Sequence, residues 1–113
     1  MSRKISIAHQ LSADAGTEGD VTLYEVEPAR RFVIKSVYIS FPAETDFELA
    51  LSIFRGIRQI APYIGAYRGE AQVIEDEVSE EISSSERVVL HYRNESTATV
   101  NKAFVLVRGE LEE

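Results

Sequence analysis

The sequence predicts an all-β protein, an antiparallel sandwich of two packed sheets with about eight strands. Three observations predict this class. Apolar and polar residues alternate with period two in several segments, turn-forming residues separate those segments at intervals of about 8–15 residues, and only residues 46–54 also fit a helical spacing. A jelly roll or a related Greek key is the natural arrangement of so many strands, and 113 residues fit a single domain spanning 1–113.

The strand pattern is weak in the amino-terminal part of the sequence and becomes regular from residue 21. Residues 4–9 alternate only weakly, so we expect an edge strand or an arm that pairs with a neighbouring molecule. Residues 11–20 are small and polar and predict a loop, which makes 1–20 a possible arm and loop. Residues 21–26 predict a strand, and the turn after it contains Pro28, which presets φ and donates no ladder bond.

Residues 31–41 (RFVIKSVYISF) predict a long strand with one irregularity. Val33 and Val37 share one parity along it, whereas Phe32 and Ile34 have the other. We therefore expect either a β-bulge or a strand that is covered on both faces.

Residues 46–54 are compatible with two structures. The alternation of Phe47, Leu49 and Leu51 indicates a strand, while the spacing of Phe47, Ala50 and Leu51 also fits one face of a helix. We expect a strand, because a glycine and a proline follow closely and the other segments have strand patterns.

Residues 55–70 predict a long connection with one short strand at 57–61. Two further short strands are expected at 72–75 and 78–82, on either side of the acidic run 75–77. Three serines then turn the chain into its last element.

The last element, residues 86–111, has the pattern of a β-hairpin. Val88 and Leu90 alternate with more polar neighbours, and Asn-Glu-Ser-Thr at 94–97 breaks the pattern with turn-forming side chains. The chain then returns through 99–107, which is rich in β-branched and aromatic residues.

Composition excludes several classes of function. The formal net charge of −7 disfavours a nucleic-acid partner, and the absence of cysteine excludes a disulfide scaffold, a thiolate nucleophile and cysteine-based metal sites. No apolar run approaches the roughly 20 residues of a membrane span. The amino terminus lacks the apolar region of a signal peptide, so we expect the protein to stay where it is made.

The sequence contains no motif for catalysis or cofactor binding. His9 and His91 are far apart, and His91 falls on the more polar side of its strand. A pair of carboxylates, as in glycosidases, is the remaining catalytic option, but the acidic residues cluster in turns, where solvation explains them. We therefore expect no catalytic residue, no cofactor and no enzymatic activity.

The acidic segment 14–20 is the candidate metal site. Asp14, Gly19 and Glu25 match the first, sixth and twelfth positions of an EF-hand calcium loop, but Gly16 at the third position offers no side-chain oxygen. We expect a flexible acidic loop without a metal, with calcium binding as the alternative.

Tyr63 and Tyr67, together with the nearby Arg58 and Arg68, indicate a contact surface. Aromatic faces stack on sugars and arginines reach hydroxyl groups, so a carbohydrate- or small-ligand-binding module is one interpretation. Tyrosine and arginine are also enriched at protein interfaces, and we favour that interpretation.

Several strands carry apolar residues on both faces. Residues 103–107 show no alternation, and 88–90 and 32–34 behave in the same way. A sheet in a small sandwich should have one wet face, so the second face would be covered by a loop or by another copy. Because no helix is expected to cover it, we infer self-association into a homo-oligomer. The alternative is a central strand with a few exposed valines. The candidate contact residues are Val89, Phe104, Leu106, Tyr63 and Tyr67.

The order of these features resembles that of small structural proteins of tailed phages and related viruses. The matching pieces are the turn VEPARR at 26–31, the strand FVIKSV at 32–37, the strand end YRN at 92–94 and the final VRGEL at 107–111. The long connection before the acidic run departs from the usual pattern. The resemblance implies a jelly-roll-like accessory or decoration component without catalytic residues. It would act as a homo-oligomer, with or without other virion proteins, in the virion or the host cytoplasm.

Overall fold

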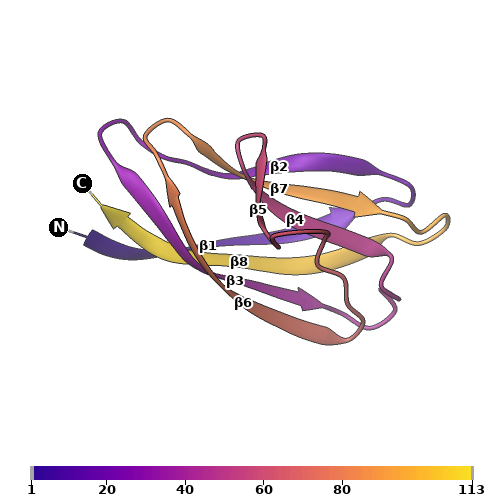
Figure 1. Cartoon of the computed structure of the whole chain (residues 1–113). Coiled ribbons are helices and arrows are strands. Elements are labelled where there is room, and N and C mark those ends of the chain that lie inside the picture. The colour runs from indigo at the N-terminus through magenta and orange to yellow at the C-terminus, as the bar shows by residue number, and fades with distance from the viewer. Residues whose placement is uncertain (1, 113) are drawn as a thin grey trace.

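A computed structural model describes residues 2–112, so Met1 and Glu113 of the predicted domain lie outside the described residues. It confirms the all-β sandwich (Figure 1), with eight strands in two four-stranded antiparallel sheets over that range. The strands are β1 (Ser2–Ala13), β2 (Glu18–Glu25), β3 (Arg31–Phe41), β4 (Leu49–Arg55), β5 (Arg58–Ala61), β6 (Gln72–Ile82), β7 (Arg87–Asn94) and β8 (Asn101–Glu112). Residues 2–112 contain no helix that could cross a membrane.

The strand order identifies the sandwich as a jelly roll. Sheet A has the order β1-β8-β3-β6 and sheet B the order β2-β7-β4-β5. The first strand therefore pairs with the last, the second with the seventh, the third with the sixth and the fourth with the fifth. Such pairing is a long double ribbon wound across two sheets, which is the jelly-roll arrangement. Every connection except β4–β5 passes from one sheet to the other.

The predicted hairpin at 86–111 is wrong, because β7 and β8 belong to different sheets. The polar turn between them carries the chain across the end of the sandwich. Asn94 is buried there, and its amide nitrogen donates to the carbonyl oxygens of Ala13 and Thr99 at 3.0 and 2.9 Å. Its amide oxygen accepts from the Ser96 backbone and the Asn101 side chain. Asn94 thus ties the β7–β8 turn to the end of β1.

The loop expected at 11–20 is much shorter in the structure. β1 continues to Ala13 and β2 begins at Glu18, which leaves only a turn at 14–17. The expected arm is the edge strand of sheet A, because β1 pairs along its whole length with β8.

The two short strands expected at 72–75 and 78–82 are one continuous strand, β6. The sequence pattern is interrupted because Asp76 and Glu80 point inward at the edge of the sheet. Both have partners there: Asp76 accepts a hydrogen bond of 2.6 Å from the Tyr67 hydroxyl, and Glu80 lies 3.9 Å from the Arg55 guanidinium.

The expectations for the central strands are confirmed. The register of β3 shifts between Ile34 and Ser36, which is the expected bulge. Gly109 of β8 passes close to it, and a Cβ there would stand 2.3 Å from the Val33 carbonyl oxygen. Residues 46–54 contain the start of β4, a strand, and the short strand expected at 57–61 is β5. The largest fully buried side chains are Phe32, Phe41, Ile34, Ile39, Leu49, Leu51, Ile53, Ile82, Leu90, Val26, Val37 and Val88.

Candidate assembly surfaces

The outer face of sheet A carries a strip of apolar side chains. Phe104 and Leu106 alternate along β8 with the fully buried Val105 and Val107, so they point away from the core. The hydrogen-bonded register places Leu106 between Ala8 of β1 and Tyr38 of β3, and it places Phe104 between Gln10 and Ser40. Val73 of β6 lies opposite Ser40 and is 52% exposed. We call Ala8, Tyr38, Val73, Phe104 and Leu106 the A-face strip.

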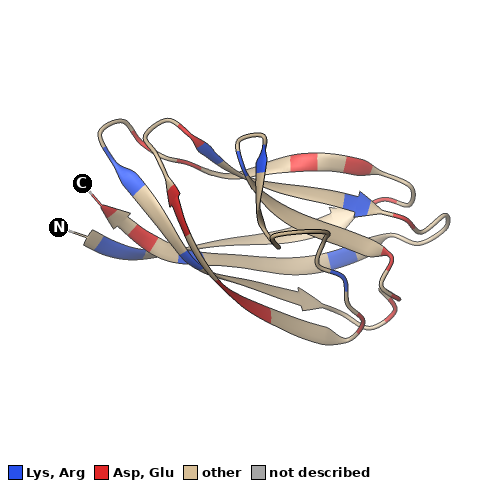
Figure 2. Cartoon of the chain, in the orientation of Figure 1, with Lys and Arg blue, Asp and Glu red and all other residues tan. Residues whose placement is uncertain are grey.

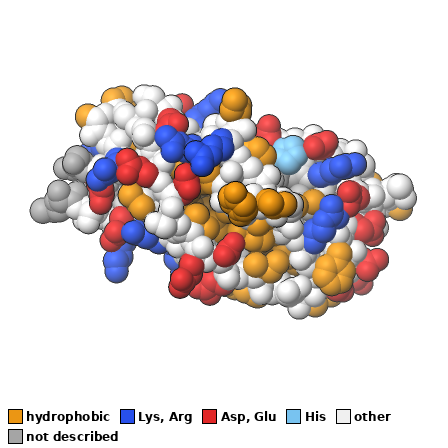
Figure 3. Space-filling model, viewed as in Figure 1, with side chains coloured by type: hydrophobic (Ala, Val, Ile, Leu, Met, Phe, Trp, Pro, Cys, Tyr) orange, Lys and Arg blue, Asp and Glu red, His pale blue; other side chains and the backbone are white. Residues whose placement is uncertain are grey.

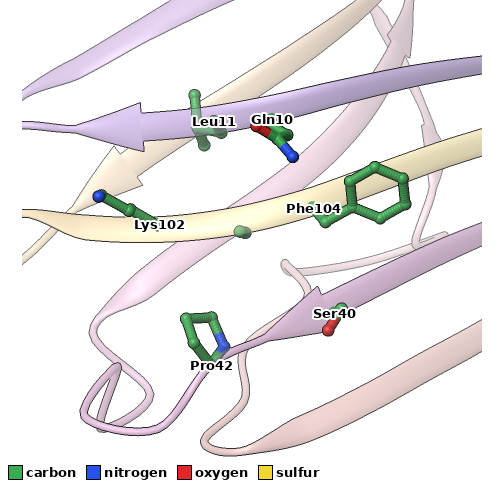
Figure 4. Close-up of a pocket in the computed structure, with 7 residues that line it drawn as sticks. Gln10, Leu11, Ser40, Pro42, Lys102 and Phe104 are labelled. Carbon is green, nitrogen blue, oxygen red and sulfur yellow. The ribbon is translucent and has the colours of Figure 1, made fainter.

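Two grooves interrupt this outer face. The first, of about 320 Å³, lies beside Phe104 and is lined by Gln10, Ser40, Pro42 and Lys102 (Figure 4). The second, of about 330 Å³, lies at the bulge of β3. Its lining includes three basic side chains, those of Lys4, Lys35 and Arg108, together with Ser6 and Ser36.

Charge is divided across the outer face of sheet A. Acidic residues colour β6, whereas basic residues colour the start of β1 and parts of β8 (Figure 2). Glu75 and Glu77 are exposed on the outward side of β6, and Lys4 and Arg108 are exposed on β1 and β8. Within residues 2–112 these four side chains make no ion pair. We call Glu75 and Glu77 the acidic column and Lys4 and Arg108 the basic column. The two columns lie on opposite halves of one face, and the half with the basic column also carries Glu110, which lies opposite Lys4 in the register.

The outer face of sheet B is built differently. Val89 points outward on β7 between two buried neighbours, Val88 and Leu90, yet it is only 8% exposed. Its cross-strand partners Thr22 and Phe54 flank it on either side. Val89 is therefore covered by its own chain and leaves little surface for a second molecule.

A histidine clamp lies next to Val89 on this face. His91 Nδ1 lies 2.6 Å from Asp20, His91 Nε2 lies 2.8 Å from Glu18, and Phe54 meets the imidazole ring edge-on with centroids 5.9 Å apart. Only an imidazolium can donate from both nitrogens. Burial lowers the pKa of His91, but the hydrogen bonds to Asp20 and Glu18 outweigh it, so the pKa lies above its ordinary value. The clamp fixes β2 to β7 and gives this face a charged, internally paired cover.

The two predicted tyrosines both lie in the connection between β5 and β6, but one is buried and the other is exposed. Tyr67 is 7% exposed, forms a β-bridge with Leu51, and donates its hydroxyl to Asp76 on the opposite sheet. It is a core residue that closes the open edge of the sandwich and leaves little of its ring for a contact. Tyr63 is 90% exposed, and hydrophobic side chains gather on the surface over this connection (Figure 3).

The predicted sugar site is not assembled. The Tyr67 ring is buried, so a ligand could not stack on it. The Arg68 guanidinium is held by the Glu95 carboxylate and donates to the Phe47 carbonyl oxygen at 3.1 Å. Tyr63 thus stands without the two partners that the sequence suggested.

The partial EF-hand spacing does not form an ion site. Asp14 lies in the turn, where its carbonyl oxygen accepts from Thr17, and Glu18 and Asp20 are bound to His91 on strand β2. Glu25 stands at the far end of that extended strand, about 23 Å from Glu18 at about 3.3 Å per residue. These oxygens therefore cannot converge on one calcium ion, whose ligands lie at about 2.4 Å.

Comparisons with known proteins show a fold shared with viral capsids. No protein-family model matches the chain, and no curated protein matches its sequence. The structure is similar to a chain in the acidic stable capsid structure of the Helicobacter pylori bacteriophage KHP30, with a TM-score of 0.54 over 100% of both chains at 15% identity. It is also similar to a chain in the capsid of cyanophage Pam1, with a TM-score of 0.50 over 96% of this chain and 85% of the other at 10% identity. The predicted resemblance is confirmed at the level of the fold.

The predicted contact residues are thus distributed over three places. Phe104 and Leu106 lie together on the outer face of sheet A, Val89 is covered on sheet B, and the tyrosines lie in the β5–β6 connection. Sequence analysis missed the partners of Phe104 and Leu106. The parity of Tyr38 within 31–41 was a usable signal for one of them, because it is opposite to that of the buried Val37 and Ile39.

Proposed function

We propose that this chain is a non-enzymatic structural component of a virus or prophage particle, and that it self-associates through the outer face of sheet A. Its setting would be the virion, or the host cytoplasm before assembly. Other particle proteins are candidate partners for its remaining surfaces.

The observation that carries the proposal is the A-face strip. It places aromatic and aliphatic side chains side by side on a sheet face that no element of the described chain covers. Contiguous apolar surface of this kind marks interaction sites on proteins of this size. The full-length similarity in fold to a chain of a phage capsid supports the particle as the setting.

Sedimentation of particles tests the setting directly. Cultures of the organism that carries the gene would be induced to release particles, which are then purified by density gradient and analysed by quantitative mass spectrometry. The proposal predicts that the chain co-sediments with particle proteins at a fixed ratio. Recovery of the chain only in the soluble fraction, while other particle proteins sediment, would contradict it.

A further inference from the structure

We infer that two copies pack face to face through sheet A, with a twofold axis that runs parallel to the strands between β8 and β3. This inference rests on the proposed self-association and specifies its geometry. In this arrangement β6 of each copy lies across β1 of the other, and β8 of each copy lies across β3 of the other. The residues that share a row across the sheet determine which side chains of the two copies meet.

The register defines four rows on the outer face that run from β1 through β8 and β3 to β6. The rows are Lys4–Glu110–Val33–Glu81, Ser6–Arg108–Ser36–Glu77, Ala8–Leu106–Tyr38–Glu75 and Gln10–Phe104–Ser40–Val73. A twofold axis parallel to the strands keeps each row at its own height and reverses its order. Every row then packs against its own reversed copy.

The charges on the outer face of sheet A favour this axis over a twofold axis perpendicular to the strands. A twofold axis in the same plane but perpendicular to the strands would place β6 on β6, and the exposed acids Glu75 and Glu77 would face their own copies. Like charges placed opposite each other are repulsive. The parallel axis instead brings the acidic column of one copy to the basic column of the other.

The two grooves receive side chains from the reversed rows. Glu77 of the second copy lies above Ser6, at the groove whose lining includes Lys4, Lys35 and Arg108. Its carboxylate would therefore enter a hollow with three positive charges, which favours it electrostatically.

Val73 of the second copy lies above Gln10, at the groove beside Phe104. This places an exposed aliphatic side chain at a groove whose lining includes Phe104, while Ser40 of the second copy lies above Phe104 itself. Between the two grooves, Leu106 of one copy meets Tyr38 of the other near the axis, so the apolar centre of the face is buried on both sides.

The size of the face predicts a weak dimer. Four strands about 4.8 Å apart and about eight residues long present roughly 500 Å² per copy. The total of roughly 1,000 Å² is at the low end of specific interfaces. Self-association is therefore expected in the micromolar range, and repeated contacts in a particle would strengthen it.

A charge substitution tests the groove assignment. Glu77→Lys places a lysine against the basic groove and should weaken dimerisation at least about tenfold in sedimentation equilibrium. Glu25→Lys is the matched control, because it makes the same change in net charge on an exposed residue of β2 in sheet B. Equal affinities for both variants would overturn the assignment.

Chemical cross-linking between introduced cysteines tests the axis, because the chain has no cysteine of its own. Sheets packed face to face lie about 10 Å apart, which is too far for a direct disulfide, so a short bismaleimide is the reagent. A Gln10→Cys/Val73→Cys double variant should form an intermolecular cross-link with it. The two positions in one chain are three strand spacings apart, about 14 Å, which is too far for the same reagent to link them within one molecule. Val73→Cys alone should remain unlinked.

The possible outcomes separate this inference from the proposal on which it rests. Cross-linking by Val73→Cys alone, or a wild-type oligomer that the double variant fails to trap, would overturn the axis while leaving self-association intact. A wild-type chain that stays monomeric at about 100 µM would overturn self-association itself.

Discussion

The outer faces of sheets A and B carry the same sequence signature and have different structures. Both have outward apolar residues beside inward ones, Leu106 next to Val107 on β8 and Val89 next to Leu90 on β7. On sheet B the cover comes from the chain itself, through Phe54 and the histidine clamp. On sheet A no element of residues 2–112 lies over the apolar strip. An outward apolar residue therefore identifies an interface only when its own neighbours leave it accessible.

The largest expected effect comes from a charge placed on sheet B. Val89→Asp buries a carboxylate between Thr22 and Phe54, so the free energy of unfolding should fall by about 3 kcal/mol or more. Urea denaturation monitored by tyrosine fluorescence measures it. A loss below about 1 kcal/mol would mean that Val89 is accessible and that the two faces do not differ.

The same substitution on sheet A should act on association. Leu106→Asp lies on a half-buried, outward position, so stability should change by less than about 1 kcal/mol while dimerisation weakens by more than about tenfold. Sedimentation equilibrium and urea denaturation on one preparation give both quantities. Unchanged dimerisation would contradict the role of the A-face strip.

Tyr67→Phe separates the core tyrosine from the exposed one. Loss of the hydroxyl removes the hydrogen bond to Asp76, and the free energy of unfolding should fall by about 1 kcal/mol with dimerisation unchanged. Burial and this hydrogen bond raise the pKa of Tyr67, so this tyrosine should ionise only above the ordinary tyrosine pKa of about 10. Alkaline spectrophotometric titration of the wild type and Tyr67→Phe checks this second point. A difference in absorbance between the two proteins that develops already at the ordinary tyrosine pKa would contradict the burial of Tyr67.

The smallest expected effect is the pH dependence of the histidine clamp. The pKa of His91 is raised in the folded state, so its stabilisation is complete below the unfolded pKa of about 6.5 and is lost as the pH rises through the folded pKa. His91→Gln should therefore cost stability mainly at acidic pH, by less than about 1 kcal/mol. Melting temperatures of both proteins across the pH range provide the measurement. If the loss of stability caused by His91→Gln instead grew as the pH rose, the pKa of His91 would not be raised in the folded state, and the histidine clamp would be refuted.

Local patterns predicted the strands and the sandwich because period-two alternation reports which face of a strand is buried. This was sufficient to suggest the bulge in β3. Residues 103–107 show no alternation, so the sequence could not tell that Phe104 and Leu106 point outward while Val105 and Val107 point inward. Period-two alternation failed where the fold depends on which strands pair, because alternation does not report the partner of a strand. The segment 86–111 looked like a hairpin, but the pairing of β7 and β8 is decided by strands more than 30 residues away.

The candidate site was only partly predictable for the same reason. Nothing near Val89 in the sequence indicates that Phe54 covers it, and nothing near Tyr67 indicates its bridge to Leu51. The acidic residues of β6 looked like a turn because Asp76 and Glu80 replace apolar residues at inward positions. Their partners Tyr67 and Arg55 are visible only in the folded chain.

Hydroxyl-radical footprinting across a concentration series tests the central claim most directly. If a second copy covers sheet A, the modification rates of Tyr38, Phe104 and Leu106 should fall together as protein concentration rises from about 1 to about 100 µM. Tyr63, which is 90% exposed on the β5–β6 connection, should react at a constant rate and serve as the internal reference. Rates on the A-face strip that stay constant relative to Tyr63 would show that water, and not a second copy, covers this face.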